Sequence, residues 1–252
     1  MDRSFEGRIA LVTGASRGIG RAVALALGAA GAHVVAVART VGALEELDDE
    51  IRAAGGEAPT LVPLDLKDME GIDRLGAALF ERFGRLDALV GNAGVLGTLT
   101  PLTHAAPKTF DQVMTINVTA NWRLLRSLDP LLRQSPAGRA VFLTSSAARK
   151  NRPFWGLYAI SKAALDHMVR TYAAESEHTA VRVTLVDPGP LRTAMRRQAM
   201  PGEDPETLRP PEAVAPKILE FLSPDWTRSG LLYDFRDDVL LAPQPPAVVA
   251  PA

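Results

Sequence analysis

The feature of this chain that most restricts its fold is a regular alternation of short apolar runs with longer amphipathic segments. The first run, residues 8–13, ends in a glycine cluster, and a helical segment over residues 21–30 follows it and stops at Gly31. A short apolar run bounded by turn residues is typical of a buried parallel strand, and glycine just past an amphipathic segment is typical of a helix C-terminus. The repeated unit therefore predicts strands joined by helical crossovers.

Continued along the chain, this pattern predicts a complete α/β architecture. Strands are expected over residues 8–13, 32–38, 60–64, 86–90, 140–144, 181–186 and 230–235. Helices are expected over residues 21–30, 41–54, 68–83, 108–133, 158–177 and 212–222, with Pro130 kinking or loosening the end of the fourth. Because right-handed crossovers place helices on both faces of a parallel sheet, we predict a Rossmann-type doubly wound parallel β-sheet of about seven strands.

The domain organisation follows from the same rhythm. No break interrupts it before Pro188, so one catalytic domain is expected over residues 1–241. The proline-containing segment around residues 190–212 predicts irregular chain with a short helical piece, placed to contact a substrate. The Pro/Ala-rich tail, residues 242–252, predicts no regular structure.

Composition excludes several classes of function. The chain has no cysteine, which rules out disulfides and thiol chemistry, and its four histidines are scattered, so no metal site is expected. A net charge of −1 provides no global attraction for nucleic acid or anionic membrane. No apolar run approaches the roughly 18 residues of a membrane span, and the N-terminus lacks the apolar core of a signal peptide. A cytoplasmic protein is therefore expected, with neither nucleic acid nor membrane as a partner.

A glycine-rich loop, residues 13–20, joins the first predicted strand to the first helix. Its glycines let the backbone turn tightly and approach a pyrophosphate, whose charge the helix N-terminus favours. The strand–loop–helix context is what a dinucleotide-binding motif requires, although a tight turn without a ligand has the same pattern. The candidate cofactor contacts in this loop are Gly14, Ser16, Arg17, Gly18, Ile19 and Gly20.

The end of the second strand indicates which dinucleotide is preferred. Chains that bind NAD typically carry an acidic residue there, about 20 residues after the loop, for the ribose hydroxyls. This chain has Arg39 at that place, and the first acid after it, Glu45, lies inside a predicted helix. A guanidinium can pair with a 2′-phosphate, with Arg17 as a second cation, so NADP(H) is predicted in preference to NAD(H). A solvated loop arginine is the alternative.

Two further strand ends carry candidate cofactor contacts. The small residues Asn92, Ala93 and Gly94 leave room for a ligand at the carboxyl edge of the sheet, where ligands of doubly wound folds bind. Asp65, followed by Leu66, is placed to meet an adenine amino group. It could equally serve as the N-cap of the next helix.

A tyrosine and a lysine four positions apart, Tyr158 and Lys162, provide candidate acid–base chemistry. On a helix they lie one turn apart on the same face. An ammonium beside a phenol favours the phenolate, which lowers the pKa of the phenol from its reference value of about 10. The pair predicts a proton donor for carbonyl reduction, and an incidental pair on an amphipathic helix is the alternative.

Together these motifs resemble the short-chain dehydrogenase/reductase family, in members of standard length, over residues 6–240. The order and spacing of the shared residues are those of the family: the loop of residues 13–20, Asn92-Ala-Gly94, Asn117, Ser145, Tyr158-x-x-x-Lys162 and Pro188-Gly189. Within the family the chain resembles a bacterial branch named by analogy with 3-oxoacyl-acyl-carrier-protein reductases.

The resemblance implies a catalytic tetrad. Tyr158 would exchange a proton with the substrate oxygen, while Lys162 would hold the nicotinamide ribose and lower the pKa of Tyr158, helped by an oxidised nicotinamide ring. Ser145, which the family's usual offset from the tyrosine selects among three adjacent hydroxyls, would hydrogen-bond the carbonyl oxygen. Asn117 would interrupt its helix and hold a proton-relaying water. The segment over the nicotinamide carboxamide is represented by Pro188, Gly189, Leu191 and Thr193.

Two positions depart from the family pattern. Gly91 stands where asparagine is usual, a change expected to loosen that turn without removing the function. Residues 233–238 replace the usual glycine-rich end of the last strand, a region that often joins subunits in the family. We expect a homo-oligomer, dimer or tetramer, paired through the helices over residues 108–133 and 158–177.

The substrate is the least specified part of the prediction. Residues 95–98, 147–155 and 190–200 are expected to line its pocket, with apolar contacts from Phe154, Trp155, Leu191, Met195 and Met200. A basic cluster at the expected mouth is either a solvated loop or an attraction for a carrier-bound acyl thioester, and it consists of Arg149, Lys150 and Arg152. The predicted function is an NADP(H)-dependent oxidoreductase acting on a ketone or secondary alcohol. An NAD(H)-dependent alcohol dehydrogenase and a non-catalytic nucleotide-binding protein are the alternatives.

Overall fold

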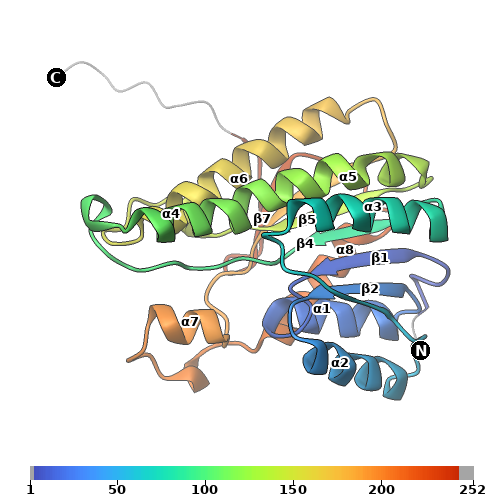
Figure 1. Cartoon of the computed structure of the whole chain (residues 1–252), viewed down its shortest axis with the longest axis horizontal. Helices are drawn as coiled ribbons and strands as arrows, with labels where there is room; N and C mark the ends of the chain where they lie inside the picture. The colour runs from blue at the N-terminus through green and yellow to red at the C-terminus, as the bar shows by residue number, and fades with distance from the viewer. Residues whose placement is uncertain (1–2, 244–252) are drawn as a thin grey trace.

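The computed structural model describes residues 3–243, which contain one eight-stranded sheet in the order β3-β2-β1-β4-β5-β6-β7-β8 (Figure 1). Neighbouring strands are parallel from β3 through β7, and β8 is antiparallel to β7. The strands are β1 (Ile9–Thr13), β2 (His33–Ala38), β3 (Thr60–Pro63), β4 (Ala88–Gly91), β5 (Arg139–Leu143), β6 (Arg182–Asp187), β7 (Leu231–Asp234) and β8 (Val239–Leu241). The doubly wound parallel sheet predicted from the alternation is confirmed.

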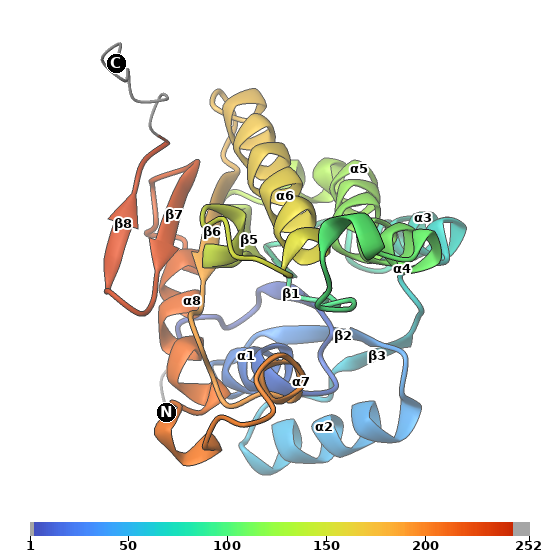
Figure 2. The ribbon, with the colours of Figure 1, turned by 90° about the vertical axis from the view of Figure 1, so that its left-hand side faces the viewer.

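Helices cover both faces of this sheet (Figure 2). One face carries α1 (Gly18–Ala29), α2 (Val41–Ala53) and α8 (Ala215–Leu222), and the other carries α3 (Met69–Phe83), α5 (Ala120–Gln134) and α6 (Gly156–Glu175). Successive strand residues point to opposite faces, so Leu11 and Val12 belong to different apolar cores, although both are fully buried. This is why the strands read as continuous apolar runs rather than as alternating ones.

Local signals determine where several helices begin and end. Asp68 caps α3 by accepting a hydrogen bond of 2.8 Å from the backbone N–H of Gly71. Gly84 ends the same helix in the left-handed region, with φ of 69°. Gly31, just past α1, has φ of 92°, so the predicted glycine stop is confirmed.

The structure differs from the prediction in two places. The helix expected over residues 108–133 consists of α4 (Pro107–Met114), one π-helical turn (Thr115–Thr119) and α5, which continues past Pro130 to Gln134. The sheet has an eighth strand, β8, which pairs with β7 across a short turn and has too few residues for a periodic signal. Of the predicted tail, residues 244–252 lie outside the described part of the chain.

The topology places a crevice at the centre of the sheet. β2 and β3 lie on one side of β1, and β4 lies on its other side. The connections that follow the neighbouring strands β1 and β4 therefore run in opposite directions along the sheet. Doubly wound sheets bind ligands at such a switch point, beyond the carboxyl ends of the strands. α7 (Ala194–Ala199) lies beyond this edge (Figure 2). Within residues 3–243, no helix is both long and apolar enough to cross a bilayer.

Candidate active site

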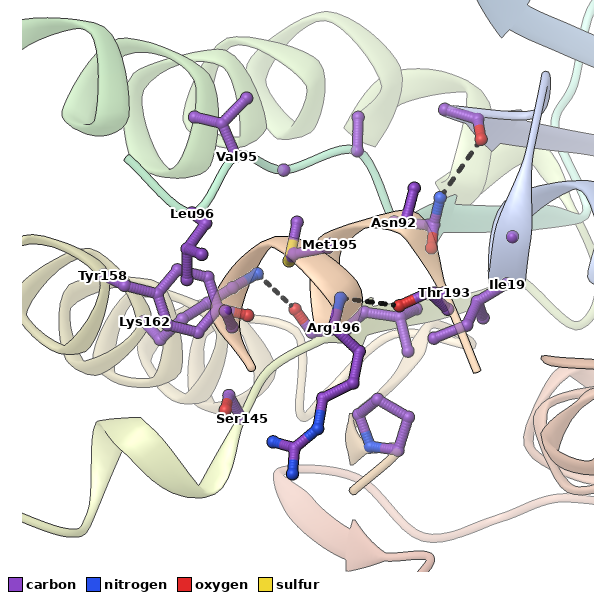
Figure 3. Close-up of a pocket in the computed structure, with 18 of the residues that line it drawn as sticks. Ile19, Asn92, Val95, Leu96, Ser145, Tyr158, Lys162, Thr193, Met195 and Arg196 are labelled. Carbon is purple, nitrogen blue, oxygen red and sulfur yellow. Dashed lines mark hydrogen bonds between the residues drawn. The ribbon is translucent and has the colours of Figure 1, made fainter. Parts of the chain in front are cut away.

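A cavity of about 910 Å³ opens at the carboxyl ends of the central strands. Tyr158, Lys162 and Ser145 lie at one end of it, and Asn92 and Ile19 lie at the other (Figure 3). The predicted site residues that line this cavity are Gly14, Ser16, Arg17, Gly18, Ile19, Arg39, Asp65, Leu66, Asn92, Ala93, Gly94, Ser145, Tyr158, Lys162, Pro188, Gly189, Leu191 and Thr193. Gly20 and Asn117 are not part of the lining but lie directly behind it.

The glycine loop is packed against the end of β4. The side-chain amide of Asn92 donates hydrogen bonds of 2.8 and 3.3 Å to the carbonyl oxygens of Thr13 and Gly14. A Cβ atom at Gly20 would lie 2.3 Å from the oxygen of Gly14 and 2.4 Å from the amide nitrogen of Asn92. Gly14 itself has φ of 66°. Glycine is therefore required at both positions by close approach and backbone conformation, so that Asn92 can hold the loop open toward the cavity.

The N-terminus of α1 is available to an anion. Its N-cap residue, Arg17, makes no side-chain capping hydrogen bond, and the first turn contains no acidic residue. Arg17 and Arg39 both line the cavity, and within residues 3–243 neither is paired with a carboxylate. Free backbone N–H groups and two uncompensated guanidinium groups at one end of the cavity suit the phosphates of a dinucleotide.

Asp65 lies at the same end of the cavity but does not cap the following helix. Its carboxylate accepts a hydrogen bond of 3.0 Å from the backbone N–H of Lys67, while Asp68 serves as the cap of α3. The alternative N-cap role of Asp65 is therefore wrong. Its carboxylate remains on the cavity wall beside Leu66, where the predicted adenine contact would be made.

Tyr158 and Ser145 come from adjacent elements at the opposite end. Tyr158 lies in the first turn of α6 and is 8% exposed, and its ring meets that of Trp155 edge-on at 6.2 Å between centroids. Ser145 follows β5, and its hydroxyl caps a short 3₁₀ turn (Ser146–Ala148) by accepting from the N–H of Ala147 at 3.2 Å. The same hydroxyl lies near enough to the phenol of Tyr158 to lower the pKa of that phenol. Both groups can therefore reach one carbonyl oxygen.

Lys162 lies one helical turn beyond Tyr158 and is buried, with 4% of its surface exposed. Its ammonium donates a hydrogen bond of 2.7 Å to the carbonyl oxygen of Leu143 and lies 5.7 Å from the centre of the Tyr158 ring. A Cβ atom added at Gly94 would lie 3.6 Å from this ammonium and 3.3 Å from the amide oxygen of Asn117. The absence of a side chain at Gly94 thus lets the loop after β4 pack closely against Asn117 and Lys162.

Burial dominates the acid–base properties of this pair. It raises the pKa of Tyr158 above its ordinary value, and the hydrogen bond with Ser145 offsets part of that rise. Burial also lowers the pKa of Lys162 to about 8, against the opposing effect of Asp166 and Asp187. Desolvation is therefore the largest influence on the pKa of Tyr158, and the ammonium of Lys162 donates to the carbonyl of Leu143.

Asn117 lies in the π-helical turn, as its predicted interruption of the helix requires. Its side-chain amide is fully buried and exchanges hydrogen bonds of 2.8 and 2.9 Å with the backbone of Val95, and it donates to Ser161 at 2.9 Å. The main-chain carbonyl oxygen of Asn117 accepts a hydrogen bond of 2.9 Å from the side-chain amide of Asn121. Asn121 was not among the predicted residues, because its position one turn after Asn117 becomes informative only when the π turn is known.

The glycine at position 91 has a packing cause. A Cβ atom there would lie 2.3 Å from the ring of Phe142 and 2.9 Å from the side-chain oxygen of Asn121. Gly91 is the last residue of β4 and fully within the sheet, paired with Phe142 on β5. The expected loosening of a turn is therefore wrong, since Gly91 provides space for Phe142 and Asn121 in an ordered strand.

The segment after β6 closes the cavity from the other side. Gly189 has φ of 63°, and its N–H donates a hydrogen bond of 3.1 Å to the side chain of Asp187. Thr193 caps α7 by accepting from the N–H of Arg196 at 3.1 Å (Figure 3). The predicted contacts of this segment therefore lie on the wall between the two ends of the cavity.

The substrate end differs from the prediction at three residues. Phe154 and Met200 do not line the cavity, and they are 57% and 42% exposed. Arg149 is not part of the cavity lining and forms an ion pair of 2.8 Å with Asp187. The apolar wall is instead built by a small cluster whose buried members are Leu96, Ala147, Tyr158 and Ala199, with Trp155 and Met195 packed against it.

Comparison with known proteins gives the same assignment as the geometry. The short chain dehydrogenase family pattern matches residues 8–204. The oxidoreductase YciK of Escherichia coli K12 is 38% identical over 230 residues, which cover 90% of this chain and 91% of that protein.

Solved structures agree with this match. A short chain dehydrogenase from Shigella flexneri 2a, complexed with NADP, has a TM-score of 0.90 at 36% identity and covers 94% of this chain and 100% of its own. A short chain dehydrogenase from Escherichia coli CFT073, complexed with NADPH, has a TM-score of 0.89 at 36% identity. The match covers 93% of this chain and 98% of that protein. Matched in sequence and in fold, the chain belongs to the short-chain dehydrogenase/reductase family of oxidoreductases.

Proposed function

We propose that this protein is an NADP(H)-dependent oxidoreductase that interconverts a ketone and a secondary alcohol, with Tyr158 as the acid–base group. The observation that carries the proposal is the placement of Tyr158, Ser145 and Lys162 at one end of a cavity whose other end holds the open N-terminus of α1. A ligand with phosphates at one end and a reactive ring at the other would bridge these two groups.

The residues present suit this cofactor. Arg17 and Arg39 are the cations available to a 2′-phosphate, and within residues 3–243 both are free of carboxylate partners. Asp65 and Leu66 would contact the adenine, and Asn92, Ala93 and Gly94 would pass beneath the middle of the dinucleotide. The NADP and NADPH bound in the two similar structures support the phosphorylated form of the cofactor.

The reaction assigns one task to each side chain. The bound cofactor supplies or accepts the hydride at the substrate carbon. During reduction Tyr158 donates its phenolic proton to the carbonyl oxygen, and during oxidation it takes that proton back. Ser145 hydrogen-bonds the same oxygen and stabilises the negative charge that develops on it. Lys162 would hold the nicotinamide ribose, and Asn117 fixes the backbone of Val95 at the edge of the cavity.

The shape of the cavity favours an apolar substrate around the carbonyl. Leu96, Ala147, Ala199 and Met195 surround the phenol of Tyr158, and Trp155 lies across its ring. A carrier-bound acyl thioester is one substrate of this kind, with Lys150 and Arg152 on the cavity wall available to its anionic part.

We further propose that residues 1–241 act as one catalytic domain in a homo-oligomer. All described strands belong to one sheet, which supports a single unit. Trp122 on α5 and Ile160 on α6 are 47% and 38% exposed, and apolar exposure on these two helices supports pairing through them.

The test is a panel of carbonyl compounds with NADPH, including 3-oxoacyl thioesters, diketones, quinones and steroids. We expect loss of NADPH absorbance with at least one member, accompanied by the alcohol product. Tight NADPH binding with no turnover of any member at any pH would favour the nucleotide-binding alternative.

A further inference from the structure

Three carboxylates lie next to the active site and come from three different elements. Asp166 lies one turn after Lys162 on α6, Asp187 ends β6, and Asp234 ends β7. Their side chains are 6%, 3% and 16% exposed. Buried carboxylates are costly unless they are paired, so a shared partner is required.

Arg149 is that partner. Its Nη2 atom lies 2.8 Å from Asp187 and 3.6 Å from Asp234, and its Nη1 atom lies 4.0 Å from Asp166. Within residues 3–243, no other arginine, lysine or histidine is ion-paired to any of the three carboxylates. Arg149 is thus the one cation that forms ion pairs with all three carboxylates among the described residues, although the charges of Arg170 and Lys162 also act on Asp166.

The ion pairs connect the two segments that would hold the reacting atoms. Arg149 follows the 3₁₀ turn that Ser145 caps, so its backbone is continuous with the Ser145 loop. Asp187 accepts the N–H of Gly189 with its other oxygen, at 3.1 Å, and thereby shapes the segment after β6. The guanidinium of Arg149 thus joins the Ser145 loop to the Pro188–Gly189 segment.

The same groups determine the charge around the acid–base pair. The charges of Asp166 on α6 and Asp187 on β6 act on the pair of Tyr158 and Lys162. These two carboxylates are faced in turn by Arg170 from α6, by Arg149 from the loop after β5 and by Asp234 from β7. The charge of Asp187 raises the pKa of both Tyr158 and Lys162, and Asp166 raises that of Lys162. One oxygen of Asp166 is buried without a hydrogen-bond partner. Compensation of Asp187 therefore depends on Arg149, whereas Asp166 is compensated by Arg170 and Lys162 as well.

We propose that Arg149 is a positioning residue of the reductase site, which holds the Ser145 loop against the Pro188–Gly189 segment and compensates the carboxylates of Asp187, Asp234 and Asp166. The proposal rests on the proposed function for the role of Tyr158. It assigns a purpose to Asp234, which lies in the segment where this chain departs from the glycine-rich strand end of its family. Without Arg149, uncompensated negative charge would hold the protons of Tyr158 and Lys162 more tightly.

The first test is the pH dependence of kcat/KM for carbonyl reduction in Arg149→Gln. We expect the alkaline limb, where the proton donor is lost, to move to higher pH, and kcat to fall about tenfold with a smaller change in KM. The double variant Arg149→Gln/Asp187→Asn removes one cation and one anion. Its alkaline limb should therefore return toward the pH at which it lies in the wild type. Arg149→Lys retains the charge but not the planar fork, so it should give an intermediate result.

A matched control separates this role from a general loss of stability. Arg123→Gln removes an arginine that pairs with Asp73 between α5 and α3, away from the cavity, and should leave the pH profile unchanged. If Arg149→Gln lowers activity and thermal stability but leaves the alkaline limb in place, and Asp187→Asn gives no rescue, Arg149 is merely structural and the proposal is wrong.

A second readout needs no substrate. Replacing Lys162 by Met should stabilise the protein at neutral pH, because the buried ammonium is costly, and the gain should shrink by about half in the Arg149→Gln background, where the ammonium is better compensated. An equal gain in both backgrounds would overturn the electrostatic part of the proposal. Absence of turnover in the wild-type protein would instead count against the proposed function. The comparison of Lys162→Met stability in the two backgrounds would still test the role of Arg149.

Discussion

The Nζ atom of Lys162 donates a hydrogen bond of 2.7 Å to the main-chain carbonyl oxygen of Leu143, the last residue of β5. This bond ties α6 to the centre of the sheet and keeps a buried ammonium beside the cavity. The ammonium is held there at a cost, since burial lowers its pKa to about 8. The buried charge of this lysine therefore lowers the stability of the protein, while its position keeps it available for the role that we propose for it.

Replacing Lys162 by Met should stabilise the protein while abolishing turnover. The shift from 10.5 to about 8 corresponds to about 3 kcal/mol of unfavourable free energy for the charged form, and loss of the bond to Leu143 returns about 1 kcal/mol. We expect a net gain of about 2 kcal/mol at pH 7 in chemical denaturation. A variant less stable than the wild type at that pH would show that the ammonium is not destabilising.

The sign of the pH dependence follows from the same shift. Between the folded pKa of about 8 and the unfolded value of 10.5, the unfolded state binds more protons. Wild-type stability should therefore rise with pH in this window, and the advantage of Lys162→Met should fade across it. An advantage that stays constant from pH 7 to pH 10 would contradict the assignment.

Replacing Arg39 by Gln should weaken NADPH binding about tenfold and leave NADH binding nearly unchanged, because one charge-assisted contact to the 2′-phosphate is lost. The measurement is a fluorescence titration with each cofactor. Arg52→Gln, at an exposed arginine on α2 outside the cavity, is the control. Equal affinity of the wild type for NADPH and NADH would remove the basis for the predicted preference.

Replacing Asn121 by Ala should lower the free energy of unfolding by about 1 to 2 kcal/mol, because the buried main-chain carbonyl oxygen of Asn117 loses its hydrogen bond from the Asn121 side chain. Because the π turn around Asn117 is then held less firmly, kcat should fall as well. Thermal unfolding and steady-state rates measure the two effects, with Gln134→Ala, at an exposed residue that ends α5 outside the cavity, as the control. A variant with wild-type stability and rate would show that Asn121 does not position Asn117.

The parts of the site that were predictable depend on local sequence. The loop of residues 13–20 and the strand ends at Arg39 and Asn92 follow from one rule, since strand, turn and helix signals are adjacent in the chain and the carboxyl ends of parallel strands converge. The spacing of Tyr158 and Lys162 likewise gives a common helix face directly.

The parts that were missed depend on contacts between distant elements. Arg149 looks like a surface residue beside Lys150 until Asp187 and Asp234 are brought to it by β6 and β7. Gly91 looks like a loosened turn until Phe142 is placed beside it across the sheet. Similarly, the spacing of Tyr158 and Lys162 does not reveal burial, which is the largest influence on the pKa of Tyr158.

The central claim is that Tyr158 transfers the proton, and Tyr158→Phe tests it most directly. The control is Tyr172→Phe on the same helix, where the hydroxyl bonds Asp129 at 2.7 Å outside the cavity. With a carbonyl compound that the wild type accepts, we expect Tyr158→Phe to bind NADPH normally and to reduce the carbonyl at least about a hundredfold more slowly, while Tyr172→Phe retains its rate. Carbonyl reduction by Tyr158→Phe at the wild-type rate would contradict the account.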